Sequence, residues 1–321
     1  MRKVGDGMDQ ADQPGTVTAT RTAPATADGE APPTPRLAVR GLVKSYGSTL
    51  AVAGVSLTVP AGRVVGLLGA NGAGKTTTIG CVAGLLPRDR GEVRICGVDP
   101  ATDPGRTGPL LGLAGQDLAL YPELPASTNL RFFAELAGMT RADADASVDE
   151  LAGALGIGPL LARRVRDLSG GQKQLVHVAA ALVHRPRLAL LDEPSAGLDL
   201  TARSRFLDTV RRTAAAGAGV LLSSHHLADV EQVCDDVVIL HRGRAVAAGP
   251  LDELIAAYAE PFVEVSAGGR RRRVPGTDVL SALAGLGDLR DLESVAVRRP
   301  SLEAVFVAVT GTRPEPGEEA R

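Results

Sequence analysis

The stretch Gly69-Ala70-Asn71-Gly72-Ala73-Gly74-Lys75-Thr76 decides the fold of this 321-residue chain. It fits the pattern G-x-x-x-x-G-K-[ST], in which glycines let successive backbone N–H groups curl around the phosphates of a nucleotide. The apolar run Val64–Leu68 precedes it and a helix-compatible run follows it, which is the context that the pattern requires. The sequence therefore predicts a nucleotide-binding loop between a strand and a helix.

The chemistry of such a loop assigns a role to most of its residues. The helix that follows presents its positive N-terminal end to the phosphates, Lys75 reaches the β and γ phosphates, and the Thr76 hydroxyl ligates magnesium. A glycine turn that happens to precede Lys-Thr is the structural alternative. The predicted nucleotide-contacting residues of the loop are Gly69, Ala70, Asn71, Gly72, Ala73, Gly74, Lys75, Thr76 and Thr77.

Two adjacent carboxylates, Asp192 and Glu193, follow the apolar run Leu188–Leu191, which reads as a buried strand. Catalysis of phosphoryl transfer rests mainly on positioning and on charge stabilisation. Asp192 is therefore predicted to hold magnesium through water, and Glu193 to orient or deprotonate the attacking water. A strand end that simply meets solvent is the alternative for this short motif.

A third motif, Leu168-Ser169-Gly170-Gly171-Gln172, narrows the class of nucleotide-binding protein. Ser169 reads as the cap of a helix over residues 172–184, with two glycines that expose backbone N–H groups at its start. A simple capped helix is the alternative. However, only this helix separates the motif from the strand that ends at Asp192, and this placement argues against kinases, GTPases and helicases.

With these motifs in this order, residues 37–249 resemble the nucleotide-binding domain of the ABC transporter superfamily. The resemblance implies that the chain binds and hydrolyses ATP with Mg²⁺. It also implies a head-to-tail dimer with a second nucleotide-binding subunit, in which Ser169, Gly170, Gly171 and Gln172 of one copy close on the ATP held by the other. We expect a separate polytopic permease as a partner and a place on the cytoplasmic face of the plasma membrane. We expect no nucleic-acid partner.

The resemblance carries four further residues over. Tyr46 matches the aromatic residue that stacks on adenine, and Gln116 matches the glutamine that senses magnesium and the attacking water. Asp199 belongs to a loop that crosses the dimer interface, and His225 matches the switch histidine at the γ-phosphate, with His226 beside it as a rival. The structural alternatives are core packing for Tyr46, an ordinary solvent-facing position for Gln116, a surface turn for Asp199 and local hydrogen bonding for His225. The expected catalytic residues are Glu193, His225 and Gln116, and the expected metal ligands are Thr76, Gln116 and Asp192.

Two segments indicate the subclass. Residues 116–138 and Pro300–Phe306 resemble ATPases paired with ABC-2-type exporters, including bacterial drug and antibiotic efflux systems, although residues 125–128 depart from the usual pattern. We therefore expect the chain to power export of a drug, an antibiotic or another hydrophobic small molecule. The alternative is a soluble ABC ATPase that acts on DNA, ribosomes or a regulatory complex, but the sequence has neither a long coiled-coil insertion nor a second phosphate loop.

The expected architecture is α/β. It has a P-loop NTPase core with a mixed sheet over residues 36–249, a helical subdomain inserted at about 117–185, and a small α+β appendage over 250–311. In the appendage, we expect strands at 262–265 and 293–297, a basic turn at 268–273 and a helix at 279–289. Residues 1–35, rich in Ala, Thr, Pro and Gly, are expected to be a disordered tail, and residues 312–321 a flexible one.

Composition excludes several other classes. The net charge of -2, from 35 basic and 37 acidic residues, gives no broad basic field for nucleic acid. The three cysteines are widely spaced and predict neither a zinc site nor a disulfide framework. No apolar run approaches the roughly 20 residues that a bilayer-spanning helix needs, so we expect any membrane-spanning part to belong to another chain.

Overall fold

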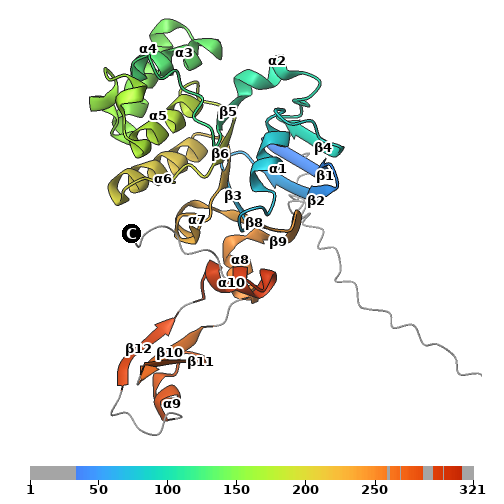
Figure 1. Cartoon of the computed structure of the whole chain (residues 1–321), viewed down its shortest axis with the longest axis vertical. Coiled ribbons are helices and arrows are strands. Elements are labelled where there is room, and N and C mark those ends of the chain that lie inside the picture. The colour runs from blue at the N-terminus through green and yellow to red at the C-terminus, as the bar shows by residue number, and fades with distance from the viewer. Residues whose placement is uncertain (1–33, 259–260, 268, 285–291, 299, 313–321) are drawn as a thin grey trace, which may run out of the picture.

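The computed structural model describes residues 34–258, 261–267, 269–284, 292–298 and 300–312, and it builds three sheets with helices around them (Figure 1). The predicted tails at 1–35 and 312–321 lie almost wholly outside the described residues. Among the described residues, no helix combines the length and the apolar character needed to cross a bilayer.

The central sheet has six strands in the order β5-β6-β7-β3-β8-β9. Neighbours from β5 to β8 are parallel and only β9 is antiparallel, so the sheet is mixed, as expected. Every residue of β3, β6 and β7 is buried, which explains their continuous apolar runs. The strands are β3 (Val64–Leu68), β5 (Leu111–Ala114), β6 (Leu188–Asp192), β7 (Gly219–Ser223), β8 (Asp236–His241) and β9 (Arg244–Pro250).

A second, antiparallel sheet has the order β2-β1-β4, with β1 (Leu37–Tyr46), β2 (Thr49–Val59) and β4 (Arg90–Ile95). Its buried face shares one hydrophobic cluster with α1 (Lys75–Val82) and with one face of the central sheet. The helix that begins at the phosphate loop is thereby held between two sheets (Figure 1).

The inserted subdomain contains α3 (Ala126–Leu136), α4 (Arg141–Leu155) and α5 (Gly170–Leu182), with the short turns η2 (Gly158–Leu160) and η3 (Val165–Asp167). Helix α5 packs closely on β5, because a Cβ built at Gly112 would lie 1.9 Å from the Ala181 carbonyl oxygen. Around the core lie α2 (Pro104–Thr107), η1 (Gly108–Leu110), α6 (Leu200–Ala215) and α7 (Leu227–Val233).

The C-terminal part begins with α8 (Leu251–Tyr258) and forms the sheet β11-β10-β12, followed by α10 (Leu302–Thr310). The strands are β10 (Phe262–Ala267), β11 (Arg270–Pro275) and β12 (Leu292–Arg298), and α9 (Val279–Ala284) follows β11. The predicted basic turn is wrong, because the arginines form strand β11 and pair with β10 through Arg273–Glu264 and Arg271–Ser266. The predicted continuation of α9 to residue 289 lies outside the described residues.

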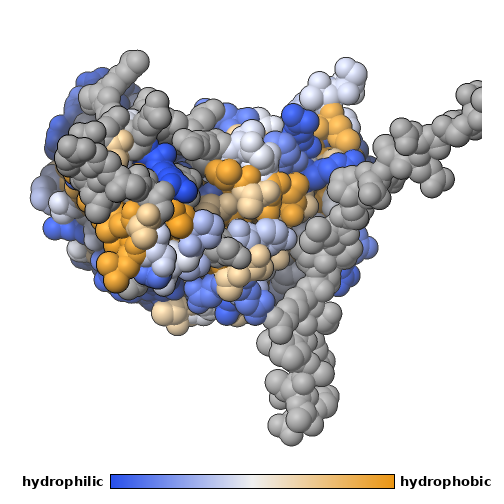
Figure 2. All heavy atoms as spheres, turned by 90° about the horizontal axis from the view of Figure 1, so that it is seen from below, coloured by the Kyte–Doolittle hydropathy of each residue, from blue (hydrophilic) through white to orange (hydrophobic). Residues whose placement is uncertain are grey.

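Helix α10 returns from the small sheet to the core, where it packs against α8, α7 and β9. The side of the molecule on which these C-terminal elements lie is seen in Figure 2, where apolar patches alternate with hydrophilic atoms. Leu302, Val305 and Phe306 of α10 are buried, so its apolar side is part of the main hydrophobic cluster.

Candidate nucleotide-binding site

Three neighbouring parallel strands bring the predicted motifs to one edge of the central sheet. In the register of the sheet, Ser223 of β7 lies opposite both Asp192 of β6 and Leu67 of β3. The phosphate loop, the two carboxylates and the switch histidine each follow one of these strands. Ligands of open α/β sheets bind outside the carboxyl ends of the strands, which is where these segments meet.

Glycine is required in the phosphate loop for close packing. Gly74 has φ 103°, and a Cβ there would lie 2.5 Å from the Ala51 carbonyl oxygen. A Cβ at Gly69 would lie 2.7 Å from both the Ala73 Cβ and the Leu240 carbonyl oxygen. The loop is therefore a compact backbone cradle that opens onto the first turn of α1, whose N–H groups favour an anion.

Lys75 is almost fully buried, and its charge is compensated by oxygen atoms around it. Its Nζ donates to the Gly69 carbonyl oxygen at 2.7 Å and lies 3.4 Å from Glu193 Oε1. A buried cation needs such partners, because its desolvation is costly. Phosphate oxygens in the cradle would supply equivalent partners, so the lysine is poised to exchange them.

Glu193 lies at the centre of the cluster. Its Oε2 accepts hydrogen bonds from His225 Nδ1 at 2.6 Å and from the His225 backbone N–H at 3.1 Å. Burial favours the neutral acid, but these hydrogen bonds and the charges of His225 and Lys75 outweigh it and lower the pKa of Glu193. The carboxylate is thus ionised and held in place.

The backbone of Glu193 is also constrained. Its φ is 51°, a left-handed conformation that is uncommon for a residue with a side chain. The Ser223 hydroxyl accepts a hydrogen bond from the Glu193 N–H at 2.9 Å. Such strain persists where the surroundings over-determine it, and this occurs frequently in active sites.

Asp192 and Thr76 form the oxygen pair expected for a magnesium site. Ser223 Oγ donates to Asp192 Oδ1 at 2.5 Å. Burial raises the pKa of Asp192, and hydrogen bonds from Ser223 and Thr76 oppose the rise in part. A hydroxyl and a carboxylate are hard ligands that suit Mg²⁺, which usually takes its remaining ligands from water and substrate phosphates. In the described part of the chain, no group of three or more His, Cys, Asp or Glu side chains could hold a metal ion.

The Ser169–Gln172 segment begins α5 with reciprocal caps. The Gln172 N–H donates to Ser169 Oγ at 3.3 Å, and Gln172 Oε1 accepts from the Ser169 N–H at 3.1 Å. A Cβ at Gly171 would lie 2.6 Å from the Gly197 carbonyl oxygen, so the segment packs on the loop before α6. Ser169 and Gly170 remain exposed to solvent and accessible to another molecule.

Each of the other predicted residues lies at or near the end of a strand or a helix. Gln116 is exposed two residues after β5, the neighbour of β6. Tyr46 is 50% exposed at the end of β1, and the Lys44 Nζ lies 5.4 Å from its ring centroid. Asp199 caps α6, because its Oδ1 accepts from the Ala202 N–H at 2.8 Å. His226 precedes α7, with its ring centroid 4.1 Å from that of His225.

Several supporting residues were not found by sequence reasoning. Ser223 binds both carboxylate residues, and Ser195 Oγ donates at 2.7 Å to Asp229, which also pairs with Arg203. In Ser223-Ser224-His225, the family resemblance assigns a role only to the histidine. The signal for Ser223 is its position at the end of the apolar run Val220–Leu222, whereas the Asp229 network joins distant segments without a local pattern.

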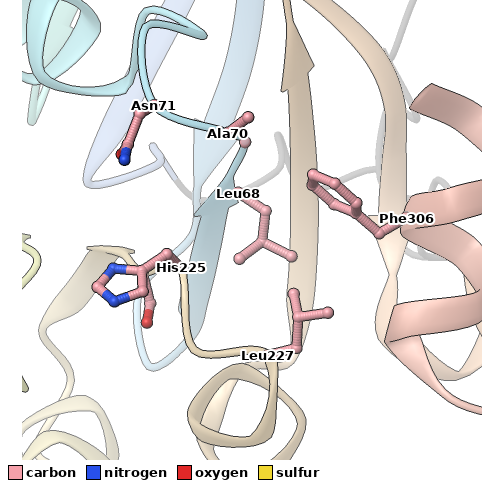
Figure 3. Close-up of a pocket in the computed structure, with 8 residues that line it drawn as sticks. Leu68, Ala70, Asn71, His225, Leu227 and Phe306 are labelled. Carbon is pink, nitrogen blue, oxygen red and sulfur yellow. The ribbon is translucent and has the colours of Figure 1, made fainter. Parts of the chain in front are cut away.

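The phosphate loop and the segment Ser224–Leu227, here called the switch segment, line one pocket together with α10. It is lined by Leu68 of β3, by Gly69, Ala70 and Asn71 of the phosphate loop, by Ser224, His225 and Leu227, and by Phe306 of α10 (Figure 3). Phe306 was not predicted to lie here, because nothing in the local sequence places α10 beside the loop.

Comparison with known proteins identifies the family. Residues 52–196 match the family model described as ABC transporter. The chain is 34% identical over 218 residues to the linearmycin resistance ATP-binding protein LnrL of Bacillus subtilis, covering 68% of this chain and 70% of that protein. It is 35% identical over 265 residues to the daunorubicin/doxorubicin resistance ATP-binding protein DrrA of Streptomyces peucetius, covering 83% and 80%. The chain belongs to the ABC transporter family.

A solved structure of an ATP-binding subunit of an ABC transporter supports this assignment. It superimposes with a TM-score of 0.66 at 34% identity, covering 69% of this chain and 92% of that one. The ABC-type core with its helical insert is therefore the fold of this chain, and the C-terminal appendage adds to it. As a member of this family the chain is an ATP hydrolase, and the cradle at Gly69–Thr77 is its candidate ATP site.

Proposed function

We propose that this chain is the ATP-hydrolysing subunit of an ABC-2-type exporter that removes a drug, an antibiotic or another hydrophobic small molecule. It works as a dimer with a second nucleotide-binding subunit, on the cytoplasmic face of the plasma membrane, beneath a separate polytopic permease. The single observation that supports hydrolysis here is the cluster in which Glu193 contacts Lys75 and His225 at the edge of the phosphate cradle.

Binding begins with an exchange of partners at Lys75. The ammonium group leaves the Gly69 carbonyl oxygen and the Glu193 carboxylate for the β and γ phosphates, and the N–H groups of the loop and of α1 surround those phosphates. Thr76 and Asp192 would hold Mg²⁺, which would neutralise phosphate charge. Tyr46 stacks on adenine at the exposed end of β1.

Hydrolysis then uses the carboxylate that Lys75 has released. Glu193, which is ionised in the ATP-free chain, orients the attacking water and accepts its proton, and the departure of Lys75 removes one of the charges that lower its pKa. His225, now hydrogen-bonded to Glu193, is placed to contact the γ-phosphate, and Gln116 approaches from the end of β5. Ser169, Gly170, Gly171 and Gln172 of the second copy, with Asp199 at the interface, complete each site.

The inserted subdomain offers the surface for the permease. Exposed apolar side chains gather at residues 118–136, and the rings of Tyr121 and Phe132 pack edge-to-face with centroids 5.1 Å apart. Contiguous apolar exposure is typical of interaction sites. The exposed set comprises Leu118, Tyr121, Leu124, Phe132 and Leu136. Closure of two cassettes on ATP would push on the permease here.

Export of a toxic compound is supported by the relatives. Beyond the two resistance proteins named above, this chain is 35% identical over 222 residues to a Nod factor export ATP-binding protein of Ralstonia nicotianae, covering 69% of each. The chain also spans 80% of the daunorubicin/doxorubicin protein, so the likeness extends into the C-terminal part. Cells lacking this chain should become more sensitive to at least one compound in a panel of hydrophobic toxins.

The role of Glu193 is tested directly by Glu193→Gln. We expect turnover to fall by at least about a hundredfold, the scale seen when groups placed for the transition state are removed, while equilibrium binding of ATP is retained. Glu150→Gln is the matched control, because Glu150 is an exposed helix residue paired with Arg185 at the surface. Substantial residual turnover in Glu193→Gln would remove Glu193 from the role of base.

A further inference from the structure

The last described helix, α10, is attached to the helix that follows the switch histidine. The Leu302 N–H at the start of α10 donates to Glu231 Oε1 of α7 at 2.5 Å. A carboxylate at a helix N-terminus is favoured by the unpaired N–H groups and the helix dipole. Because α7 begins two residues after His225, this bond links the C-terminal part to the switch segment.

Phe306 makes a second link, one helical turn further along α10. It is 3% exposed and forms one wall of the pocket whose other walls are the start of the phosphate loop and the segment from Ser224 to Leu227. In Figure 3 the Phe306 ring comes from α10 on the right, Leu68 lies between it and His225, and Leu227 lies below Leu68. The ring therefore borders the same pocket as the two segments whose relative position sets the distance between His225 and the phosphates.

The switch segment is held in two ways. On its polar side, His225 Nδ1 forms a hydrogen bond with Glu193 Oε2 at 2.6 Å, and the His226 N–H donates to Ser224 Oγ at 2.9 Å. On its apolar side, Leu227 lines the pocket that Phe306 closes. Loss of the ring would leave the apolar side without support, and a misplacement of about 1 Å can lower a rate a hundredfold.

We propose that Phe306 is a positioning residue for ATP hydrolysis, which holds the His225 segment against the phosphate loop and makes turnover depend on the seating of α10. This proposal rests on the proposed catalytic role of the Glu193–His225 pair. It also gives the small sheet a function. The sheet lies in the chain between α8 and α10, which pack on each other, so displacement of the sheet would reach the switch through Phe306.

The first test measures backbone hydrogen exchange in the full-length, ATP-free chain. Phe306→Ala should accelerate exchange at residues 224–230 at least about tenfold, because local opening is easier where apolar contacts are few. Val305→Ala is the matched control, since Val305 is fully buried on the same helix but outside the set that lines the pocket. It should leave exchange in this segment unchanged. Equal acceleration by both variants, or by neither, would overturn the proposal.

The second test measures turnover in the full-length chain. Phe306→Ala should lower kcat about tenfold with little change in ATP affinity, and Phe306→Leu, which keeps most of the volume, should recover at least half of the loss. In a His225→Ala background, Phe306→Ala should lower turnover no further, because the effects of two residues that act through the same element are not additive. A tenfold loss that persists in that background would overturn the proposal. Full turnover in His225→Ala alone would instead refute the proposed function of the histidine.

Discussion

Glu193 has a strained backbone and a side chain that is charged although it is largely buried. Its backbone is left-handed and its side chain is largely buried, yet its carboxylate remains the charged form because His225 and Lys75 face it. A carboxylate whose pKa is lowered in the folded protein binds fewer protons there than in the unfolded chain. By linkage, its ionised form stabilises the fold above its ordinary pKa of about 4.3, and this contribution is lost as the pH falls through the lower folded value.

This linkage predicts a difference in acid stability. The melting temperature of the wild-type chain should fall more steeply than that of Glu193→Gln as the pH is lowered from about 5 to about 3, because only the wild-type chain loses this carboxylate. The measurement is a series of thermal melts in the absence of ATP. Parallel curves for the two proteins across this range would contradict the assigned direction of the pKa shift.

The residues of this site could be named from sequence, but their contacts could not. Lys75, Glu193 and His225 lie in motifs that are recognisable one at a time. The ion pair between Lys75 and Glu193 depends on β3, β7 and β6 being adjacent, although in the chain the first lies more than a hundred residues from the others. Strand order is a property of long-range pairing, and local patterns do not contain it.

The two glycines in the first turn of helix α5 have different surroundings. That turn is capped by Ser169 and Gln172, and Gly171 lies against the carbonyl oxygen of Gly197 in the loop before α6. Next to it, a Cβ at Gly170 would meet no atom within 4 Å. The two glycines therefore differ, since only one of them is needed for packing within the chain.

Alanine substitution should separate these two glycines. Gly171→Ala should destabilise the chain by about 1–3 kcal/mol, because overpacking forces the backbone apart. Gly170→Ala should leave stability unchanged or raise it by up to about 1 kcal/mol, since alanine is the better helix former. Denaturant unfolding of the ATP-free chain measures both values. A loss of stability in Gly170→Ala equal to that in Gly171→Ala would refute the packing argument.

The sequence predicted strands correctly where the strand is almost wholly apolar and every residue of it is buried. The prediction was wrong where the strand is rich in charged residues. The apolar runs Val64–Leu68 and Leu188–Leu191 predicted strands β3 and β6 correctly. The four arginines at 270–273 suggested a basic turn, but they lie in strand β11, whose backbone pairs antiparallel with β10. An edge strand tolerates charge, since one of its backbone edges and much of its surface stay in water.

In the whole molecule, the proposed dimer would use two separate parts of each chain as half-sites. The phosphate cradle lies at the carboxyl edge of the central sheet, while Ser169 and Gly170 are exposed at the start of α5. A two-fold dimer would apply each half twice and create two composite sites. The sequence suggested this arrangement only through the family resemblance, because nothing in one chain's pattern reports a partner.

Mixing two inactive variants tests this composite site. Lys75→Ala disables the cradle and Ser169→Arg places a bulky cation at the exposed turn of α5, so each homodimer should lack two sites. In a dimer that holds one copy of each variant, one site carries both lesions and the other carries neither. With equal mixing, half of the dimers are mixed, and about a quarter of wild-type turnover should return if the sites act independently. If each chain instead used its own Ser169, mixing would restore nothing even though mixed dimers form.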